Sequence, residues 1–178
     1  WEGQCAGCHS VGYQVAKDAG TGELLASATP DINGAFDIDG NGQPDEINIG
    51  CEQCHGPGSK HREEALKPDE GSGRTIITHK GKHIINPDLL STERSSQICG
   101  RCHERQYGQS TIGLTDTPVS AENKFAPPGI SRKEYLEKYV AASRKTYVAS
   151  EMWPDMMHAK AHRAQYSTWL RSKHARNG

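Results

Sequence analysis

All six cysteines of this 178-residue chain fall into three copies of one pattern, Cys-x-x-Cys-His, at residues 5–9, 51–55 and 99–103. On a helical turn the first, fourth and fifth residues of such a pattern share one face, so two thiols and an imidazole point toward one flat object. This spacing is the attachment signature of c-type haem, in which both sulfurs form thioether bonds to the porphyrin and the imidazole coordinates the iron. The pattern therefore predicts three covalently attached haems. The predicted thioether residues are Cys5, Cys8, Cys51, Cys54, Cys99 and Cys102, and the predicted proximal iron ligands are His9, His55 and His103.

Other uses of paired cysteines explain this pattern less well. A zinc site would need a second pair about a dozen residues further along, whereas more than 40 residues separate these pairs. A thioredoxin-like redox pair is expected once, between a strand and a helix. A disulfide framework suits a secreted chain, but closely spaced pairs are a poor way to cross-link it. None of these three uses accounts for a histidine directly after every pair.

Large apolar side chains are scarce, because leucine, isoleucine, valine and phenylalanine together number 26 of the 178 residues. A share below about 20% indicates disorder only when the net charge is also high, and here the net charge is −1 with histidine neutral. So few apolar side chains cannot offset the ordering entropy of a conventional globular domain of this length. We therefore expect the haems themselves to form the hydrophobic core, with the chain wrapped around them.

The predicted fold class is mainly α with extensive coil, and the helices are expected to be concentrated in the C-terminal part. Residues 1–130 carry many Gly and Pro turn signals and no convincing strand pattern, which indicates a loop-rich region that binds three haems. Residues 131–178 are expected to form two helices that supply distal iron ligands. We expect the two regions to make one structural unit.

The two C-terminal helices are predicted from their end signals. Ser131 and Glu134 form a capping box at the start of a helix over residues 131–149. Trp153-Pro154 should interrupt it, and a second helix is predicted over about residues 156–175, with basic side chains near its C-terminal end.

Residues 50–61 read Gly-Cys-Glu-Gln-Cys-His-Gly-Pro-Gly-Ser-Lys-His and resemble a block found in a large superfamily of multihaem c-type cytochromes. Residues 85–89 are similar to the stretch that joins two haem motifs there, and residues 162–175 resemble a helix that precedes a further motif. The superfamily includes tetrahaem electron carriers of nitrifiers, hydroxylamine-oxidoreductase-like proteins and extracellular cytochrome filaments. The resemblance implies electron transfer through closely packed haems.

The resemblance also implies which of the six remaining histidines lie opposite the proximal ligands. On one continuous helix His162 and His174 would lie ~18 Å apart along the axis and roughly 120° apart around it, so they would serve different haems. His79 and His83 are expected to be solvated, because Lys and Gly lie between them. The candidate distal iron ligands, in order of preference, are His61, His174, His162 and His158.

Residues 37–48 match the calcium loop of an EF-hand. Oxygen-bearing side chains occupy positions 1, 3, 5 and 9, Gly42 at position 6 allows the sharp turn, and a backbone carbonyl would serve at position 7. Position 12 is Asn where a bidentate Glu is expected, and no flanking helices are evident, so a solvated polar turn is the alternative. The candidate calcium ligands are Asp37, Asp39, Asn41, Gln43, Asp45 and Asn48.

Covalent haem attachment points to the periplasm or the cell exterior. The chain begins at Trp1 without a leader, so we expect a signal peptide to have been removed, and no run of about 20 apolar residues predicts a membrane span. Members of the superfamily normally carry more than three haems, and this chain ends four residues after His174. We therefore expect a fragment or a subunit of a larger cytochrome, with haem ligation across chains as one consequence.

The favoured function is transfer of single electrons through mostly bis-histidine haems, with no substrate converted. Two alternatives stay open: an enzyme that converts nitrite or hydroxylamine at one open iron, and a subunit of an extracellular conductive cytochrome assembly. The expected partners are other redox proteins or cytochrome subunits, and not nucleic acid. Three arginines, Arg62, Arg101 and Arg105, are expected to balance haem propionates.

Overall fold

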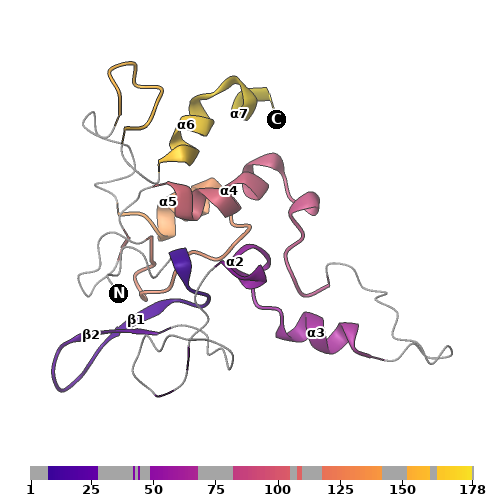
Figure 1. Cartoon of the computed structure of the whole chain (residues 1–178), viewed down its shortest axis with the longest axis vertical. Coiled ribbons are helices and arrows are strands. Elements are labelled where there is room, and N and C mark those ends of the chain that lie inside the picture. The colour runs from indigo at the N-terminus through magenta and orange to yellow at the C-terminus, as the bar shows by residue number, and fades with distance from the viewer. Residues whose placement is uncertain are drawn as a thin grey trace.

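The computed structural model describes residues 8–27, 42, 44, 49–67, 82–104, 108–109, 118–141, 152–160 and 164–177. These residues are mainly helical with little strand, which confirms the predicted mainly α class. Within them no helix is both long enough and apolar enough to cross a membrane. The elements, in chain order, are β1 (Gln14–Lys17), β2 (Leu24–Ser27), α2 (Cys51–His55), α3 (Ser59–Ala65), the 3-10 helix η1 (Pro87–Leu89), α4 (Thr92–His103), α5 (Arg132–Lys138), α6 (Gln165–Arg171) and α7 (Lys173–Asn177) (Figure 1).

Helix α4 is the centre of the arrangement, since α5 and α6 both pack against it (Figure 1). It begins where the Ser91 hydroxyl accepts a hydrogen bond from the backbone N–H of Arg94 at 3.4 Å, as an N-cap does. The longest described helix therefore lies before residue 131, outside the C-terminal region in which helices were expected to concentrate. Its buried residues are mostly polar or small, so apolar periodicity gave no signal; they are Gln97, Ile98, Gly100 and Arg101.

Helix α5 begins where the capping box predicted. The Ser131 hydroxyl accepts a hydrogen bond from the backbone N–H of Glu134 at 3.1 Å. The helix is shorter than predicted, because it ends at Lys138 and Tyr139 is its C-cap. Residues 142–149, the last part of the predicted span, lie outside the described residues.

The second predicted helix is wrong over its first residues. Met152 pairs with Ala159 in an antiparallel bridge, so that the chain turns back on itself between them. Met156 has a φ of +54°, a conformation that a helix does not contain. Helical structure begins only at Gln165, and Ser172, with a ψ of 163°, separates α6 from α7. The helical distance expected between His162 and His174 therefore does not apply, and His162 itself lies outside the described residues.

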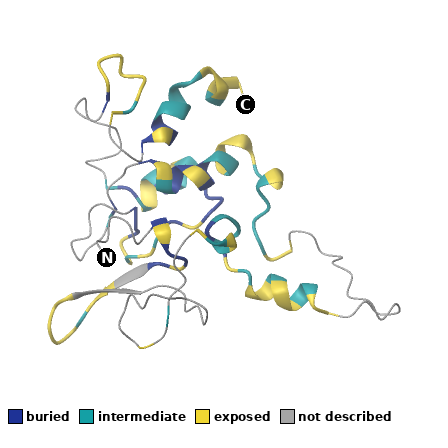
Figure 2. Cartoon of the chain, in the orientation of Figure 1, coloured by how far each residue is buried: buried dark blue, intermediate teal, exposed yellow. Residues whose placement is uncertain are grey.

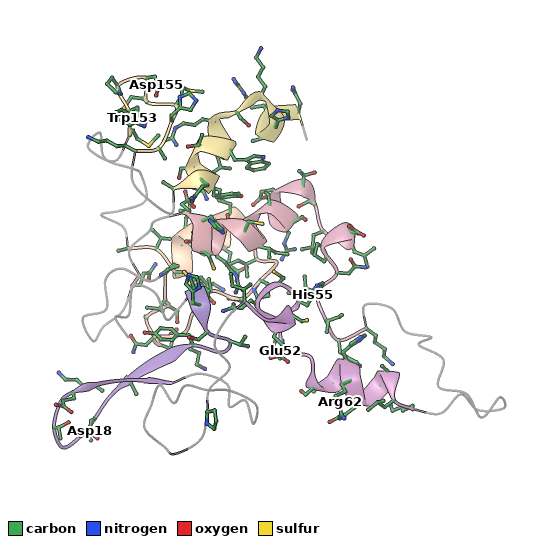
Figure 3. All side chains as sticks on the ribbon, in the orientation of Figure 1. Asp18, Glu52, His55, Arg62, Trp153 and Asp155 are labelled. Carbon is green, nitrogen blue, oxygen red and sulfur yellow. The ribbon has the colours of Figure 1, made fainter. Side chains whose placement is uncertain are left out.

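The turn within residues 152–160 is organised by one carboxylate, that of Asp155 (Figure 3). Its oxygens accept hydrogen bonds from the backbone N–H groups of Met157 and His158 and from the Nδ1 of His158 at 2.5 Å. These bonds, that of the His158 ring first, lower the pKa of Asp155 to about 2.

We predict a pH dependence confined to this turn. Because the pKa of Asp155 is lower in the folded chain than its usual value of about 4, the carboxylate stabilises the turn above about pH 4. This stabilisation is lost as the pH falls toward about 2. An NMR titration of the Asp155 carboxyl carbon should show a midpoint near 2, and His158→Ala should raise it. A midpoint near 4 in the unaltered chain would contradict the prediction.

A short antiparallel hairpin precedes the second motif, which corrects the expectation of no strand. In it β1 pairs with β2, with Gln14 opposite Ser27 and Lys17 opposite Leu24. The connecting turn is closed by Asp18, whose Oδ1 accepts from the backbone N–H groups of Gly20 and Thr21 at 2.9 and 2.6 Å (Figure 3). A hairpin turn held by its own side chain depends on neighbouring residues only, so it forms without alternating apolar residues in the strands.

The apolar core is small. One cluster of buried side chains consists of Ala126, Ile130, Tyr135 and Val140. Elsewhere the described interior mixes apolar side chains, such as those of Val11 and Val119, with polar and charged groups. Figure 2 shows the buried residues gathered around α4 while α3 is largely exposed. Among the described residues the clusters of buried apolar side chains are therefore small.

Candidate haem-binding sites

The described parts of the Cys-x-x-Cys-His motifs are helical. The second motif is the whole of α2, and the third is the last five residues of α4. The first ends in a helical turn at Cys8 and His9, while Cys5 lies outside the described residues. No disulfide joins the five described cysteines.

In the second and third motifs the residues that would hold haem are less buried than the second x residue of each motif. Cys51, Cys99 and His103 are exposed, whereas Gln53 and Arg101, the second x residues, are buried. The other three cysteines and histidines of these motifs are half-buried: Cys54, His55 and Cys102. Each helix thus anchors itself through an x residue and presents its thiols and imidazole on a different face.

The imidazole of the second motif is oriented by the segment before η1. His55 Nδ1 lies 2.7 Å from the carbonyl oxygen of Ile85, and the N–H of Ile85 donates to the carbonyl of His55 at 2.8 Å. A carbonyl oxygen only accepts, so Nδ1 carries the proton and the lone pair of the neutral ring is on Nε2. Metal-binding histidines commonly have this arrangement, in which the second ring nitrogen is held by a carbonyl.

A cavity of about 300 Å³ lies beside this imidazole, lined by His55, Gly56, Pro57, His83, Ile84 and Ile85. Gly56 ends α2 with a φ of +75°, which glycine adopts at no steric cost. His83 was predicted to be solvated, and it is exposed at the rim. His79 lies outside the described residues.

The same segment holds a second imidazole. His61, on α3, has its Nδ1 2.8 Å from the carbonyl oxygen of Lys82, so its Nε2 also carries the lone pair. The Lys82 ammonium pairs with Glu64 of α3 at 2.7 Å. Lys82 therefore orients the imidazole of His61 on α3, and Ile85 orients that of His55 on α2 (Figure 1).

The third motif faces an aromatic wall. A cavity of about 310 Å³ is lined by Ser96, Cys99, His103, Gln165, Tyr166 and Trp169. The rings of Tyr166 and Trp169 are stacked, with centroids 5.4 Å apart and planes 15° from parallel. His103 Nδ1 lies 3.4 Å from Oε1 of Gln165. A flat apolar surface next to a thiol and an imidazole suits a planar aromatic cofactor.

Tyr166 takes its place because Gly100 has no side chain. A Cβ added at Gly100 would lie 2.4 Å from the nearest carbon of the Tyr166 ring. Gly100→Ala normally stabilises a helix by about 1 kcal/mol, but here we expect a loss of roughly 1–3 kcal/mol from overpacking. Urea unfolding measures the change, with Gly20→Ala as a control that meets nothing closer than 3.4 Å. A more stable Gly100→Ala chain would contradict the prediction.

No protein-family model, curated protein or solved structure matches this chain. The interpretation of the site therefore depends on its own residues.

Buried hydrogen bonds tie the three motifs together. Gln53 of the second motif donates from Nε2 to the carbonyl of Ser10, directly after the first motif. Arg101 of the third motif donates to the backbone carbonyl of Gln53 and, at 2.7 Å, to its Oε1. Arg101 also donates to the carbonyl of Ala126 at 2.5 Å. Sequence reasoning missed Gln53, and a polar side chain at an x position is too common to have signalled this role.

An ion pair directly follows the third motif. Glu104 is 2% exposed, and its carboxylate accepts two hydrogen bonds from Arg132 of α5, at 2.6 and 2.7 Å. Ser167 of α6 donates to the same carboxylate at 3.2 Å. Two-pronged pairing of this kind is strong and directional. It connects α5 and α6 to the end of α4 beside His103.

The other predicted site residues are placed separately. His158 lies in the exposed turn described above, and His174 is exposed on α7. Arg62 is exposed on α3 (Figure 3), and Arg105 lies outside the described residues. The six candidate calcium ligands also lie outside them. Among the described residues, no three His, Cys, Asp or Glu side chains are grouped as a bare metal-ion site.

Proposed function

We propose that this chain is a trihaem c-type cytochrome that transfers single electrons. The observation that supports it most directly is the state of the second motif. Its cysteines and histidine lie on a helical face outside the tightly buried interior, and the Nδ1 of His55 is occupied by Ile85, which directs the lone pair to Nε2. The residues present therefore fit a covalently attached haem.

The proposed roles of the residues follow from their chemistry. The thiol pairs would hold the porphyrin edges as thioethers, and the histidine after each pair would ligate the iron. Haem supplies an iron that gains and loses one electron reversibly. Ile85 fixes the orientation of His55, and the Tyr166–Trp169 wall gives an apolar side to the third site.

We propose His61 as the first distal ligand. Its Nδ1 is held by Lys82, so its Nε2 lone pair is available in the neutral ring. His/His ligation lacks the potential-raising effect of a methionine ligand, so low reduction potentials are expected. His158 and His174 are exposed, which suits ligation of an iron on a neighbouring chain as well as on their own.

Haems would also add apolar surface to the small interior of the described residues. The described apolar cluster is small, and the cavities of about 300 and 310 Å³ adjoin the histidines of the second and third motifs. Because covalent haem attachment takes place outside the cytoplasm, we place the protein in the periplasm or outside the cell. Its partners would be other redox proteins, bound transiently over small interfaces.

The test is expression with a c-type cytochrome maturation system, followed by denaturing mass spectrometry, which counts only covalent haem. We expect a mass increase equal to three haems and an electron paramagnetic resonance spectrum of low-spin ferric iron. A colourless product with free thiols at all three motifs would overturn the proposal. A high-spin signal that changes with nitrite or hydroxylamine would favour an enzyme instead.

A further inference from the structure

Arg101 is a buried positive charge with no carboxylate partner among the described residues. The residue is 4% exposed, and its hydrogen bonds go to three uncharged oxygens, two on Gln53 and one on Ala126. Its guanidinium also lies 5.1 Å from the centre of the Phe125 ring. The Nε atom is buried without a hydrogen-bond partner. Arginine keeps its proton in proteins, so the charge stays.

Arg132, a half-buried arginine of the same region, shows the contrast. Arg132 is neutralised by the bidentate carboxylate of Glu104, as most buried charges are. An uncompensated buried charge is costly because it loses its hydration. Burial accordingly lowers the pKa of Arg101, whereas hydrogen bonds to Glu104 help to raise the pKa of Arg132.

Arg101 also links the three motifs through hydrogen bonds. It belongs to the third motif, bonds directly to Gln53 of the second, and through Gln53 is linked to Ser10 beside the first. The sulfurs of Cys8, Cys54 and Cys102 are all near enough to influence its guanidinium electrostatically. Sulfurs converted to thioethers carry no charge, so they would not neutralise it. Both terminal nitrogens already donate to Gln53 and Ala126, so of the guanidinium nitrogens only Nε is left for the haem propionate that Arg101 is expected from the sequence to balance.

We propose that Arg101 is a fixed internal charge that raises the reduction potentials of the haems held by these three motifs. This inference rests on the proposed function. An iron that accepts an electron becomes more negative by one charge, and a nearby positive charge in a weakly polarisable interior favours that state. Net charge and burial around a cofactor are established means of setting its potential. Arg101 is a positioning and tuning residue and not an iron ligand.

The experiment compares reduction potentials of variants by spectroelectrochemical titration. For Arg101→Gln, we expect the ratio of reduced to oxidised haem at a fixed applied potential to fall about tenfold, which is about 59 mV for a one-electron couple. Arg101→Lys keeps the charge and should stay within about twofold of the unaltered protein. The exposed Lys133→Gln on α5 removes one solvent-screened positive charge and, as the control, should also stay within about twofold.

Gln53→Glu provides a second test that leaves Arg101 in place. A carboxylate at Gln53 would lie against the guanidinium and neutralise it, so this variant should shift the haem ratio in the same direction as Arg101→Gln. If the Arg101→Gln protein does not accumulate on expression, Gln53→Glu alone tests the role of the Arg101 charge. Unchanged ratios in both variants would overturn the inference, and so would an equal fall in Arg101→Lys.

Denaturing mass spectrometry of each variant separates this inference from the function on which it rests. If the unaltered chain carries no covalent haem, both proposals are overturned. A chain that carries three haems and shows no shift in Arg101→Gln overturns only the role of Arg101.

Discussion

Replacement of both thiols of the second motif, Cys51→Ser with Cys54→Ser, is expected to remove one third of the covalent haem. These two cysteines are the only ones in that motif, and serine forms no thioether. The pyridine haemochrome absorbance per protein should fall from three equivalents to two, and denaturing mass spectrometry should show the loss of one haem. We also expect a lower unfolding temperature, because the variant loses a haem, a large apolar group, and the chain has few apolar side chains to replace it.

Lys60→Ser is the control for this experiment, since Lys60 is exposed on α3 next to His61 and should leave all three haems attached. The same number of covalent haems in the double-cysteine variant as in the unaltered chain would show that the second motif does not attach haem. Loss of all haem would show instead that the three sites mature together, a coupling consistent with the buried bonds through Gln53.

Arg132→Met is expected to be the most destabilising single substitution in the described C-terminal half. It would leave the carboxylate of Glu104, which is 2% exposed, buried without its cation. Breaking a buried ion pair in this way costs about 3 kcal/mol or more of unfolding free energy. Urea unfolding of the haem-loaded protein, followed by tryptophan fluorescence, measures the loss.

Two comparisons show whether the buried charge is the cause. Glu104→Gln combined with Arg132→Met leaves no unpaired charge, so the double variant should be more stable than Arg132→Met alone. Lys138→Met breaks an exposed i,i+4 pair with Glu134 and should have no measurable effect. A double variant no more stable than Arg132→Met would mean that packing, and not the unpaired carboxylate, determines the loss.

Local signals in the sequence predicted the structure well where one short segment contains the whole cause. The Ser131 cap depends on two residues three positions apart, and the start of α5 was found from them. Asp155 shows the limit of such reasoning. Its carboxylate caps the following N–H groups as at a helix start, but the bridge between Met152 and Ala159 turns the chain back. No short-range pattern reveals that pairing.

For the candidate sites, too, features that depend on local spacing were predicted, and contacts with distant residues were not. The Cys-x-x-Cys-His spacing was sufficient to place thiols and imidazoles on helical turns. The partners of those turns come from distant residues: Ile85 for His55, Gln53 for Arg101, and Glu104 for Arg132. Such contacts depend on how helices pack, and their residues are ordinary polar or apolar types. They could not be assigned before the arrangement around α4 was known.

The segment that contains Lys82 and Ile85 should constrain which mutations accumulate there during evolution. Two main-chain oxygens three residues apart aim imidazoles from two separate helices. An insertion or deletion between them would misdirect both rings at once, whereas side-chain replacement at either position would leave the oxygens in place. In related proteins we therefore expect the residue types of this segment to vary while its length stays constant.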